Sequence, residues 1–127
     1  GASRILSRAD DLLQALGRNS VDIVIDVVGG AAFGRLLEVL RPGGRYAVAG
    51  AIAGPLVELD LRTLYLKDLS LLGCTVTTAG QFAALVRRIE QGQLRPVVGA
   101  IFPLRQAREA QDAFLSKTQA GKIVLVP

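Results

Sequence analysis

Residues 21–50 read VDIVIDVVGGAAFGRLLEVLRPGGRYAVAG, and this stretch alone contains the order strand, turn, helix, turn, strand. The first run, Val21–Val28, is rich in Val and Ile and apolar apart from two aspartates, as is typical of a parallel strand buried on both faces. Apolar side chains then recur at the spacing of one helix face, at Phe33, Leu36, Leu37 and Leu40. The Pro-Gly-Gly turn at 42–44 ends that helix before a second strand at Arg45–Ala49. Because parallel strands are joined by such crossovers, the stretch predicts one βαβ unit.

The alternation of strands and helices continues on both sides of this unit. Upstream, we expect a short strand at Arg4–Leu6 and then a helix that begins near Ser7 and Asp10, a pair resembling a capping box, and ends at Gly17. Downstream, Asp60 is placed to cap a short helix, and the further expected elements are a strand at 70–76, a helix at 81–91, an extended stretch at 97–104, a helix at 106–116 and a strand at 122–126. The predicted fold class is α/β, one layered domain with a parallel sheet and helices on both faces.

The composition limits the chemistry that this chain can carry. It has 127 residues, enough for one domain with a core, and it contains one cysteine and no histidine. A lone cysteine forms no internal disulfide, and without histidine the chain cannot by itself assemble a zinc site or a His-based nucleophile. We therefore expect no metal ligand and no catalytic residue here. Asp26 and Tyr46 fall inside expected strands and are interpreted as structural.

Charge and hydropathy indicate which partners to expect. The formal net charge is +4, but the basic residues are scattered along the chain without interleaved aromatic residues. This pattern is typical of a solvated surface, so we expect no nucleic-acid partner. No apolar run is long enough to cross a bilayer and no signal peptide is recognisable, which predicts no membrane partner and a cytoplasmic location. The chain begins at Gly1 rather than Met, and we expect it to be a fragment of a longer protein.

The segment Gly29–Gly34, GGAAFG, must be considered as a phosphate-binding turn, because it follows a strand and precedes a helix as in a loosened G-x-A-x-x-G fingerprint. That fingerprint also requires an acidic residue at the end of the next strand, where this chain has VAGA. Glu58 and Asp60 come too late, beyond a proline. The favoured interpretation is a tight turn that lets the backbone approach a ligand, with a pyrophosphate role as the alternative.

Six segments, taken in order, resemble the medium-chain dehydrogenase/reductase superfamily, and most of all its zinc-free quinone oxidoreductase branch. They are VDIVIDVVGG, LRPGGRYAVAG, VELDLRTLYLKDLSLLGC, EQGQLRP, IFPLRQAREAQDAF and GKIVLVP. The resemblance covers nearly the whole chain, from Gly1 to Pro127. It implies that residues 1–127 are the C-terminal portion of a Rossmann-like nucleotide-binding domain, incomplete because the first βαβ unit with its glycine-rich loop is missing. Residues 97–127 would return toward a catalytic domain outside this chain.

The resemblance also implies which residues border a nicotinamide cofactor. Val28 and Gly29 match the end of a strand beside the cofactor ribose, where the missing side chain of Gly29 would allow close approach. The alternative for Gly29 is a plain turn. Ala49, Gly50 and Ala51 match a turn whose backbone meets the nicotinamide carboxamide, where small residues keep the ring pocket open.

Three further positions are implied in the same way. Cys74 and Thr75 match a strand end that faces the nicotinamide, although a buried thiol filling a core gap is an equal alternative for Cys74. Lys122 matches a basic position that reaches the cofactor phosphates in some members, against a solvated strand-end lysine.

The resemblance implies that the parent protein is an NAD(P)H-dependent oxidoreductase delivering hydride to a quinone, an enone or a carbonyl, or an enzyme of the alcohol dehydrogenase type. NADP is the expected cofactor, with NAD as the alternative. We expect the isolated chain to be inactive and to bind NADPH weakly or not at all, because the phosphate-binding loop would lie upstream. Superfamily members commonly dimerise through this half of the domain, which implies a homodimer.

Two other interpretations stay open at this point. LRPGGRYAV also resembles the later part of an S-adenosylmethionine-dependent methyltransferase, although such domains usually finish with an antiparallel hairpin and this chain finishes GKIVLVP. The other is a non-catalytic dimerisation module that pairs with its own copy through Leu71–Val76 or Pro55–Leu61, because strand edges without a neighbour favour such pairing.

Overall fold

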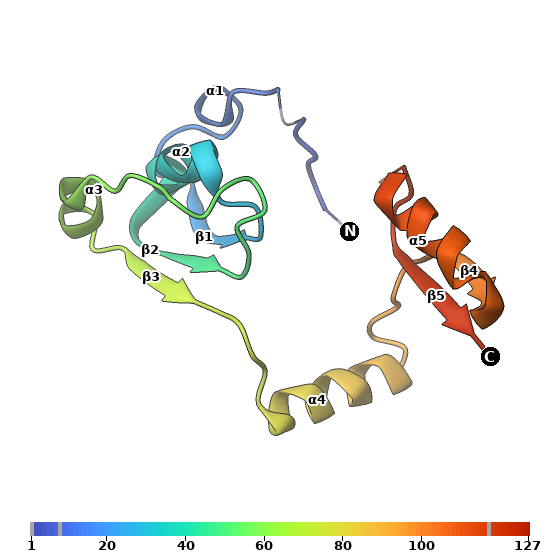
Figure 1. The fold of residues 1–127 in the computed structure, drawn as a ribbon. Helices are drawn as coiled ribbons and strands as arrows, with labels where there is room; N and C mark the ends of the chain where they lie inside the picture. Colours follow the sequence, from blue (N-terminus) through green and yellow to red (C-terminus); the bar gives the residue numbers. More distant parts are fainter. Residues whose placement is uncertain (1, 8, 117) are drawn as a thin grey trace. The chain divides into compact units, whose positions relative to one another are not determined.

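A computed structural model describes residues 2–7, 9–116 and 118–127. The chain divides into two compact units, Gly1–Val76 and Thr77–Pro127, each with its own parallel strands (Figure 1). This arrangement confirms the predicted α/β class with parallel pairing. The two units are described in turn.

The first unit is built on a three-stranded parallel sheet in the order β1 (Val21–Asp26), β2 (Leu40–Val48) and β3 (Ser70–Gly73). In the register, Asp26 lies opposite Val48, and Val48 lies opposite Gly73. All three strands therefore end at the same edge of the sheet. This is the edge where open α/β sheets bind their ligands.

The boundaries of the central βαβ unit differ from the sequence prediction by a few residues. β1 ends at Asp26, because the carboxylate of Asp26 binds the backbone of the next residues and turns the chain. Leu40 adopts an extended conformation with ψ 133° and pairs with Val21, so β2 begins before the Pro-Gly-Gly turn and contains a bulge there.

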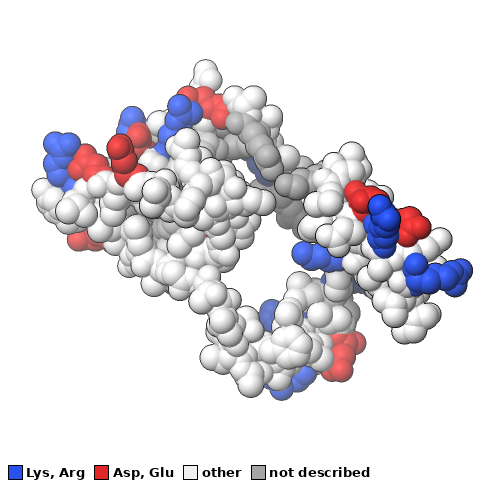
Figure 2. All heavy atoms as spheres, in the orientation of Figure 1, with Lys and Arg blue, Asp and Glu red and all other residues white. Residues whose placement is uncertain are grey.

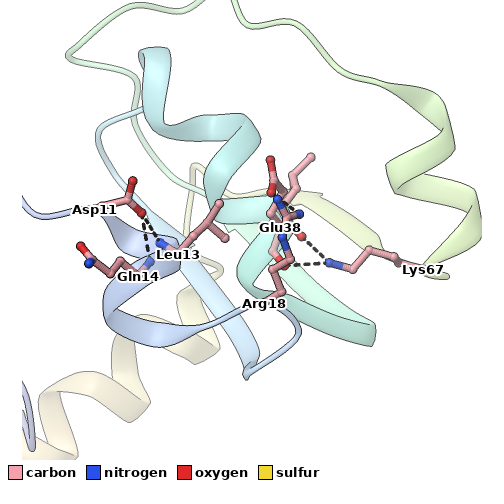
Figure 3. Close-up of polar contacts among 7 residues, drawn as sticks. Asp11, Leu13, Gln14, Arg18, Glu38 and Lys67 are labelled. Carbon is pink, nitrogen blue, oxygen red and sulfur yellow. Dashed lines mark hydrogen bonds and ion pairs between the residues drawn. The ribbon is translucent and has the colours of Figure 1, made fainter.

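The helices of this unit begin where a carboxylate can accept from their first amides. α1 (Leu12–Leu16) is capped by Asp11, which accepts from the amides of Leu13 at 2.8 Å and Gln14 at 3.0 Å (Figure 3). The predicted start near Ser7 and Asp10 is wrong, because that pair forms a separate turn in which the Ser7 amide donates to Asp10 Oδ2 at 2.8 Å. Residues 4–6 form no strand.

The other two helices follow the turns after β1 and β2. A 3₁₀ turn at Gly30–Ala32 leads into α2 (Phe33–Val39). α3 (Leu61–Leu66) is capped by Asp60, whose carboxylate accepts from the Arg62 amide at 2.9 Å, and this confirms the predicted cap.

The core of the unit lies on one face of the sheet, where α1 and α2 pack together. The buried side chains are Val24, Phe33, Leu37, Val39, Leu40, Tyr46 and Leu69. Side chains alternate between the two faces of a strand, so the residues between them point the other way. On that opposite face Ile25 is 75% exposed and Leu72 is 48% exposed. Within the described residues, β1 is thus buried on one face rather than on both.

The second unit contains α4 (Ala79–Glu90), β4 (Val98–Pro103), a 3₁₀ turn at Leu104–Gln106, α5 (Ala107–Ser116) and β5 (Lys122–Val126). β4 and β5 pair in parallel, and α5 packs against both. α4 starts two residues earlier than predicted, because Thr78 and Gln81 form a capping box in front of it.

Charges of both signs are interspersed on the visible face (Figure 2). Several are paired, as in Arg62 with Asp60 at 2.8 Å and Arg18 with Glu38. Among the described residues, none of the helices combines the length and the apolar character that crossing a membrane requires.

Candidate functional site

The candidate site is the edge of the first sheet where the strands end. The turn after β1, residues 26–30, and the loop after β2, residues 49–54, are joined there by backbone hydrogen bonds. The amide of Ala49 donates to the Asp26 carbonyl at 2.8 Å, and the amide of Ala53 donates to the Val28 carbonyl at 2.8 Å. The two segments therefore form one layer of backbone over the end of the sheet.

This close packing requires glycine at three positions, Gly29, Gly30 and Gly50, and the first and last of these show why. Gly29 has φ 66°, and a Cβ on it would lie 2.9 Å from the carbonyl oxygen of Gly54 and 3.1 Å from Ala51 Cα. A Cβ on Gly50 would lie 2.8 Å from the carbonyl oxygen of Val27. The space beside Gly29, expected from the sequence to admit a ligand, is thus filled by the 51–54 segment of the same chain.

Two buried side chains, Asp26 and Tyr46, fix the turn after β1 through hydrogen bonds. Asp26 is 5% exposed and Tyr46 is 2% exposed. Asp26 Oδ1 accepts from the amides of Val28 at 2.7 Å and Gly29 at 3.0 Å, and Asp26 Oδ2 accepts from the Tyr46 hydroxyl. The carboxylate therefore connects the interior of β2 with the turn.

These contacts set the protonation of both groups. Burial raises the pKa of Asp26, but the hydrogen bonds from Tyr46, Gly29 and Val28 outweigh it and leave this pKa below its ordinary value. Burial, together with the hydrogen bond to Asp26 and the charge of Asp26, raises the pKa of Tyr46. Asp26 is accordingly an acceptor and Tyr46 a donor at neutral pH.

The same geometry bears on the GGAAFG segment. The Gly29 amide donates to Asp26, and the Gly30 amide donates to the Gly54 carbonyl at 3.1 Å. The first two amides of the segment are therefore engaged within the protein, beside a carboxylate, and are not available to a phosphate. The structure favours the tight-turn interpretation of Gly29–Gly34.

A hollow of about 630 Å³ opens beside the turn. Its walls include apolar side chains of β1 and α2, together with Val28 and Gly29, and its polar groups come from Ser7, Asp10, Asp26 and Arg35. Val28 is 41% exposed there. The volume is in the range of small-molecule sites in proteins.

The other predicted residues divide between the two units. Ala49, Gly50 and Ala51 form the start of the loop after β2, next to the turn. Cys74 follows β3 at the same edge, where its amide donates to the Val48 carbonyl at 2.8 Å. Its side chain is exposed rather than a filler of the core, and Thr75 is exposed beside it.

Lys122 belongs to the second unit. It is the first residue of β5 and lines a hollow of about 270 Å³ between α5 and β5. The structure thus gathers Val28, Gly29, Ala49, Gly50, Ala51, Cys74 and Thr75 at one edge of the first sheet, whereas Lys122 lies at the start of a strand in the other unit.

Sequence reasoning missed the part that Asp26 plays in this site and the polar rim of the hollow at Ser7, Asp10 and Arg35. A signal for Asp26 was present, because an aspartate placed two or three residues before glycines at a strand end commonly accepts from their amides. No comparable signal marked Arg35, since α2 carries it to the hollow through tertiary packing.

A family model described as zinc-binding dehydrogenase matches residues 1–125 of this chain. The chain belongs to the zinc-binding dehydrogenase family. It is thereby a member of the medium-chain dehydrogenase/reductase superfamily, as the resemblance of its six segments implied. The methyltransferase interpretation is not favoured, because the relatives that match include proteins named quinone oxidoreductase and alcohol dehydrogenase.

Individual members of the family are similar along most of the chain. The quinone oxidoreductase of Lama guanicoe is 33% identical over 124 residues, which are 92% of this chain and 37% of that protein. A provisionally named alcohol dehydrogenase structure from Sinorhizobium meliloti 1021 is 47% identical with a TM-score of 0.89, covering 100% of this chain and 37% of that one. A mycobacterial quinone oxidoreductase structure is 26% identical with a TM-score of 0.82, covering 100% and 44%. The chain therefore spans less than half the length of these relatives.

The name of the zinc-binding dehydrogenase family raises the question of a metal. Among residues 2–7, 9–116 and 118–127, no group of three or more His, Cys, Asp or Glu side chains is placed to hold a metal ion, and the sequence has no histidine. The described residues therefore do not fit a zinc site.

Proposed function

We propose that this chain contributes part of the cofactor site of an NAD(P)H-dependent oxidoreductase that reduces a quinone, an enone or another carbonyl compound, or that acts as an alcohol dehydrogenase. The observation that carries the proposal is the gathering of small residues and an apolar hollow at the carboxyl edge of a parallel sheet. In Rossmann-like sheets this edge is where dinucleotides bind. Membership of the zinc-binding dehydrogenase family supports the same chemistry.

We derive the proposed cofactor contacts from where each residue lies at the edge of the first sheet. Val28 and Gly29 would border the cofactor ribose beside the 630 Å³ hollow. Ala49, Gly50 and Ala51 would present backbone groups to the nicotinamide, since their side chains are small enough to leave room for the ring. The bound nicotinamide supplies the hydride, and the residues of this chain orient it and exclude water.

Three other residues complete the proposed contacts. Cys74 and Thr75, at the end of β3, would flank the same ring. Lys122 would offer its ammonium to the cofactor phosphates, for which we propose NADP with NAD as the alternative. A point charge of this kind strengthens phosphate binding but leaves geometry to other groups.

We further propose that residues 1–127 are the C-terminal portion of the nucleotide-binding domain and that 97–127 return toward a catalytic domain. The isolated chain then lacks both the glycine-rich loop and the reacting centre. We expect no reductase activity from it, and a dissociation constant for NADPH above the micromolar range, because the contacts of the glycine-rich loop to the phosphates would be missing and Lys122 alone would not replace them.

Calorimetric titration tests this proposal on two proteins, the 127-residue chain and the whole oxidoreductase that contains it, with NADPH, NADH and S-adenosylmethionine as ligands. We expect tight binding of NADPH by the whole protein only. A submicromolar dissociation constant for NADPH in the isolated chain would contradict the proposal that the phosphate-binding part of the site lies outside this chain. Binding of S-adenosylmethionine instead of either dinucleotide would overturn the proposed function.

We also propose a homodimer that pairs through β3. This strand lies at one edge of the described sheet, and its Leu72 is 48% exposed. Unpaired strand edges that carry apolar side chains favour pairing with a second copy. Light scattering after size exclusion should give a dimer, and Leu72→Lys should shift the mass toward the monomer. A monomeric parent protein would refute this part.

A further inference from the structure

We infer that Asp26 and Tyr46 act together as positioning residues for the cofactor-binding edge, by fixing the peptide groups of Val28 and Gly29. The inference rests on the proposed function, because it gives these two buried side chains a part in the binding of the nicotinamide dinucleotide. It departs from the expectation that both residues serve the strands that contain them.

One carboxylate, that of Asp26, connects the turn after β1 with β2, and a ring pair extends the connection to α2. Asp26 Oδ1 accepts from the amides of Val28 at 2.7 Å and Gly29 at 3.0 Å, while Oδ2 accepts from the Tyr46 hydroxyl. Tyr46 is in turn held by Phe33 at the start of α2, with ring centroids 5.3 Å apart and an interplanar angle of 86°. The turn is therefore tied to β2 and, through an edge-to-face ring pair, to α2.

The ionised carboxylate stabilises the fold relative to its protonated form, but an apolar pair in the same place would serve stability about as well. A carboxylate that is 5% exposed has lost its hydration, and its hydrogen-bond partners in the described part of the chain are all neutral. A buried charge of this kind generally adds little net stability compared with apolar side chains of the same volume. Its specific effect is directional, because it determines where two successive amides point.

The direction of those amides matters for the site. Gly29 has φ 66°, a conformation that a glycine can leave at little cost, so its orientation depends on what its amide binds. Val28 is 41% exposed and lines the hollow together with Gly29. Releasing the Gly29 amide would leave the peptide between these residues held only at its other end, where the Val28 carbonyl accepts from the Ala53 amide at 2.8 Å, and the Val28 side chain would be less firmly placed on the wall of the hollow.

Tyr46→Phe is the main test, because it removes one hydroxyl and retains the ring that packs on Phe33. Asp26→Asn is the conservative partner, since its amide oxygen can still accept from the two backbone amides without the negative charge. Leu69→Val is the matched control, because it weakens the same core at the start of β3, at the opposite end of the sheet. Unfolding measurements on the three variants come first, and the comparison uses them only if they are folded and destabilised to a similar extent.

Two readouts separate positioning from general loss of stability. In the 127-residue chain, amide proton shifts and hydrogen exchange of Val28 and Gly29 should change in Tyr46→Phe and in Asp26→Asn and remain as in wild type in Leu69→Val. In the whole oxidoreductase, the dissociation constant for NADPH should rise about three- to ten-fold in Tyr46→Phe and Asp26→Asn, which is the effect of one weakened hydrogen bond, and stay unchanged in Leu69→Val.

Unchanged amides together with an unchanged dissociation constant in both site variants would overturn the inference while leaving the proposed function intact. An equal loss of NADPH affinity in Leu69→Val would also overturn it, since the effect would then follow stability. A wild-type oxidoreductase that binds neither NADPH nor NADH would overturn the proposed function, and the positioning role for the cofactor with it.

Discussion

The ammonium of Lys67 donates to the carbonyl oxygen of Leu37 at 2.8 Å and to that of Glu38 at 3.1 Å, so a side chain at the end of α3 closes the C-terminal end of α2 (Figure 3). The last carbonyls of a helix have no partner within it, and a cation there also compensates the helix dipole. Burial lowers the pKa of Lys67, although the charge of Glu38 opposes this shift.

Lys67→Met should therefore weaken the end of α2. We expect the free energy of unfolding of the first unit to fall by roughly 1–2 kcal/mol, because two carbonyls lose a charged donor and the apolar stem is retained. Native-state hydrogen exchange of the α2 amides measures the change. Arg45→Met is the control, since it removes an exposed cation from β2 of the same unit. Equal effects of the two substitutions would show that the contact itself contributes nothing.

Gly29 and Gly17 form a natural pair for testing the packing of the two loops at the candidate site. Both have positive φ, 66° and 82°, but a Cβ would lie 2.9 Å from the Gly54 carbonyl at Gly29 and would meet nothing within 4 Å at Gly17. Gly17→Ala should cost only the backbone strain, about 1 kcal/mol, whereas Gly29→Ala should cost about 2–4 kcal/mol, because the 51–54 segment must also move. Chemical denaturation of both variants measures the difference, and equal losses would refute the close packing.

Much of the fold could be predicted from local patterns in the sequence. The period of the apolar residues gave α2 and the parallel strands, Asp60 marked the start of α3, and Lys122–Val126 was predicted with its observed bounds. One of the errors lies where neighbouring polar residues compete for one cap. Asp10 and Asp11 both follow Ser7 closely, and only the geometry shows that Asp11 caps α1 while Asp10 closes the preceding turn.

The candidate site was less predictable, because it depends on how separate segments meet. The residues at the ends of β1, β2 and β3 could be placed at one edge from the parallel order alone. Two features of the site depend on contacts between residues about twenty or more positions apart. The 51–54 loop fills the space beside Gly29, and the Tyr46 hydroxyl donates to Asp26. Sequence periodicity carries no information about such contacts, so the sequence by itself predicts for Asp26 only a place in a strand.

The Asp26 carboxylate should make the first unit sensitive to acid. Its pKa in the folded state lies below the ordinary value of 3.8, so the carboxylate stabilises the fold above pH 4 and this contribution is lost as the pH falls through the folded-state pKa. The pKa values of Asp11 and Asp60 are lowered as well, so these two carboxylates add to the loss of stability at low pH. In urea denaturation between pH 2 and 7, Asp26→Asn should therefore show a shallower decline in stability below pH 4 than wild type. Parallel curves would contradict the lowered pKa.

Tyr46 should make the first unit sensitive to alkali, in contrast to the acid sensitivity expected from Asp26. Its pKa in the folded state is raised above 10.0, so the hydroxyl stabilises the fold below pH 10 and this contribution is lost as the pH rises beyond it. Tyr46→Phe should flatten the loss of stability of the first unit above pH 10. Tyr65→Phe is the matched control, because it removes a hydroxyl from a side chain that is 62% exposed on α3. A steeper loss in Tyr46→Phe would contradict the assignment of the donor.

The capping box at the start of α4 allows a test confined to the second unit. The Thr78 hydroxyl accepts from the Gln81 amide at 3.2 Å, and the Gln81 side chain accepts from the Thr78 amide at 2.8 Å. Thr78→Ala should destabilise α4 by about 1 kcal/mol, because the Gln81 amide loses its acceptor. Hydrogen exchange should accelerate in the first turn of α4 and stay unchanged in β5. Thr77→Ala, one residue before the cap, should have no such effect, and equal acceleration in both variants would show that Thr78 does not fix the start of α4.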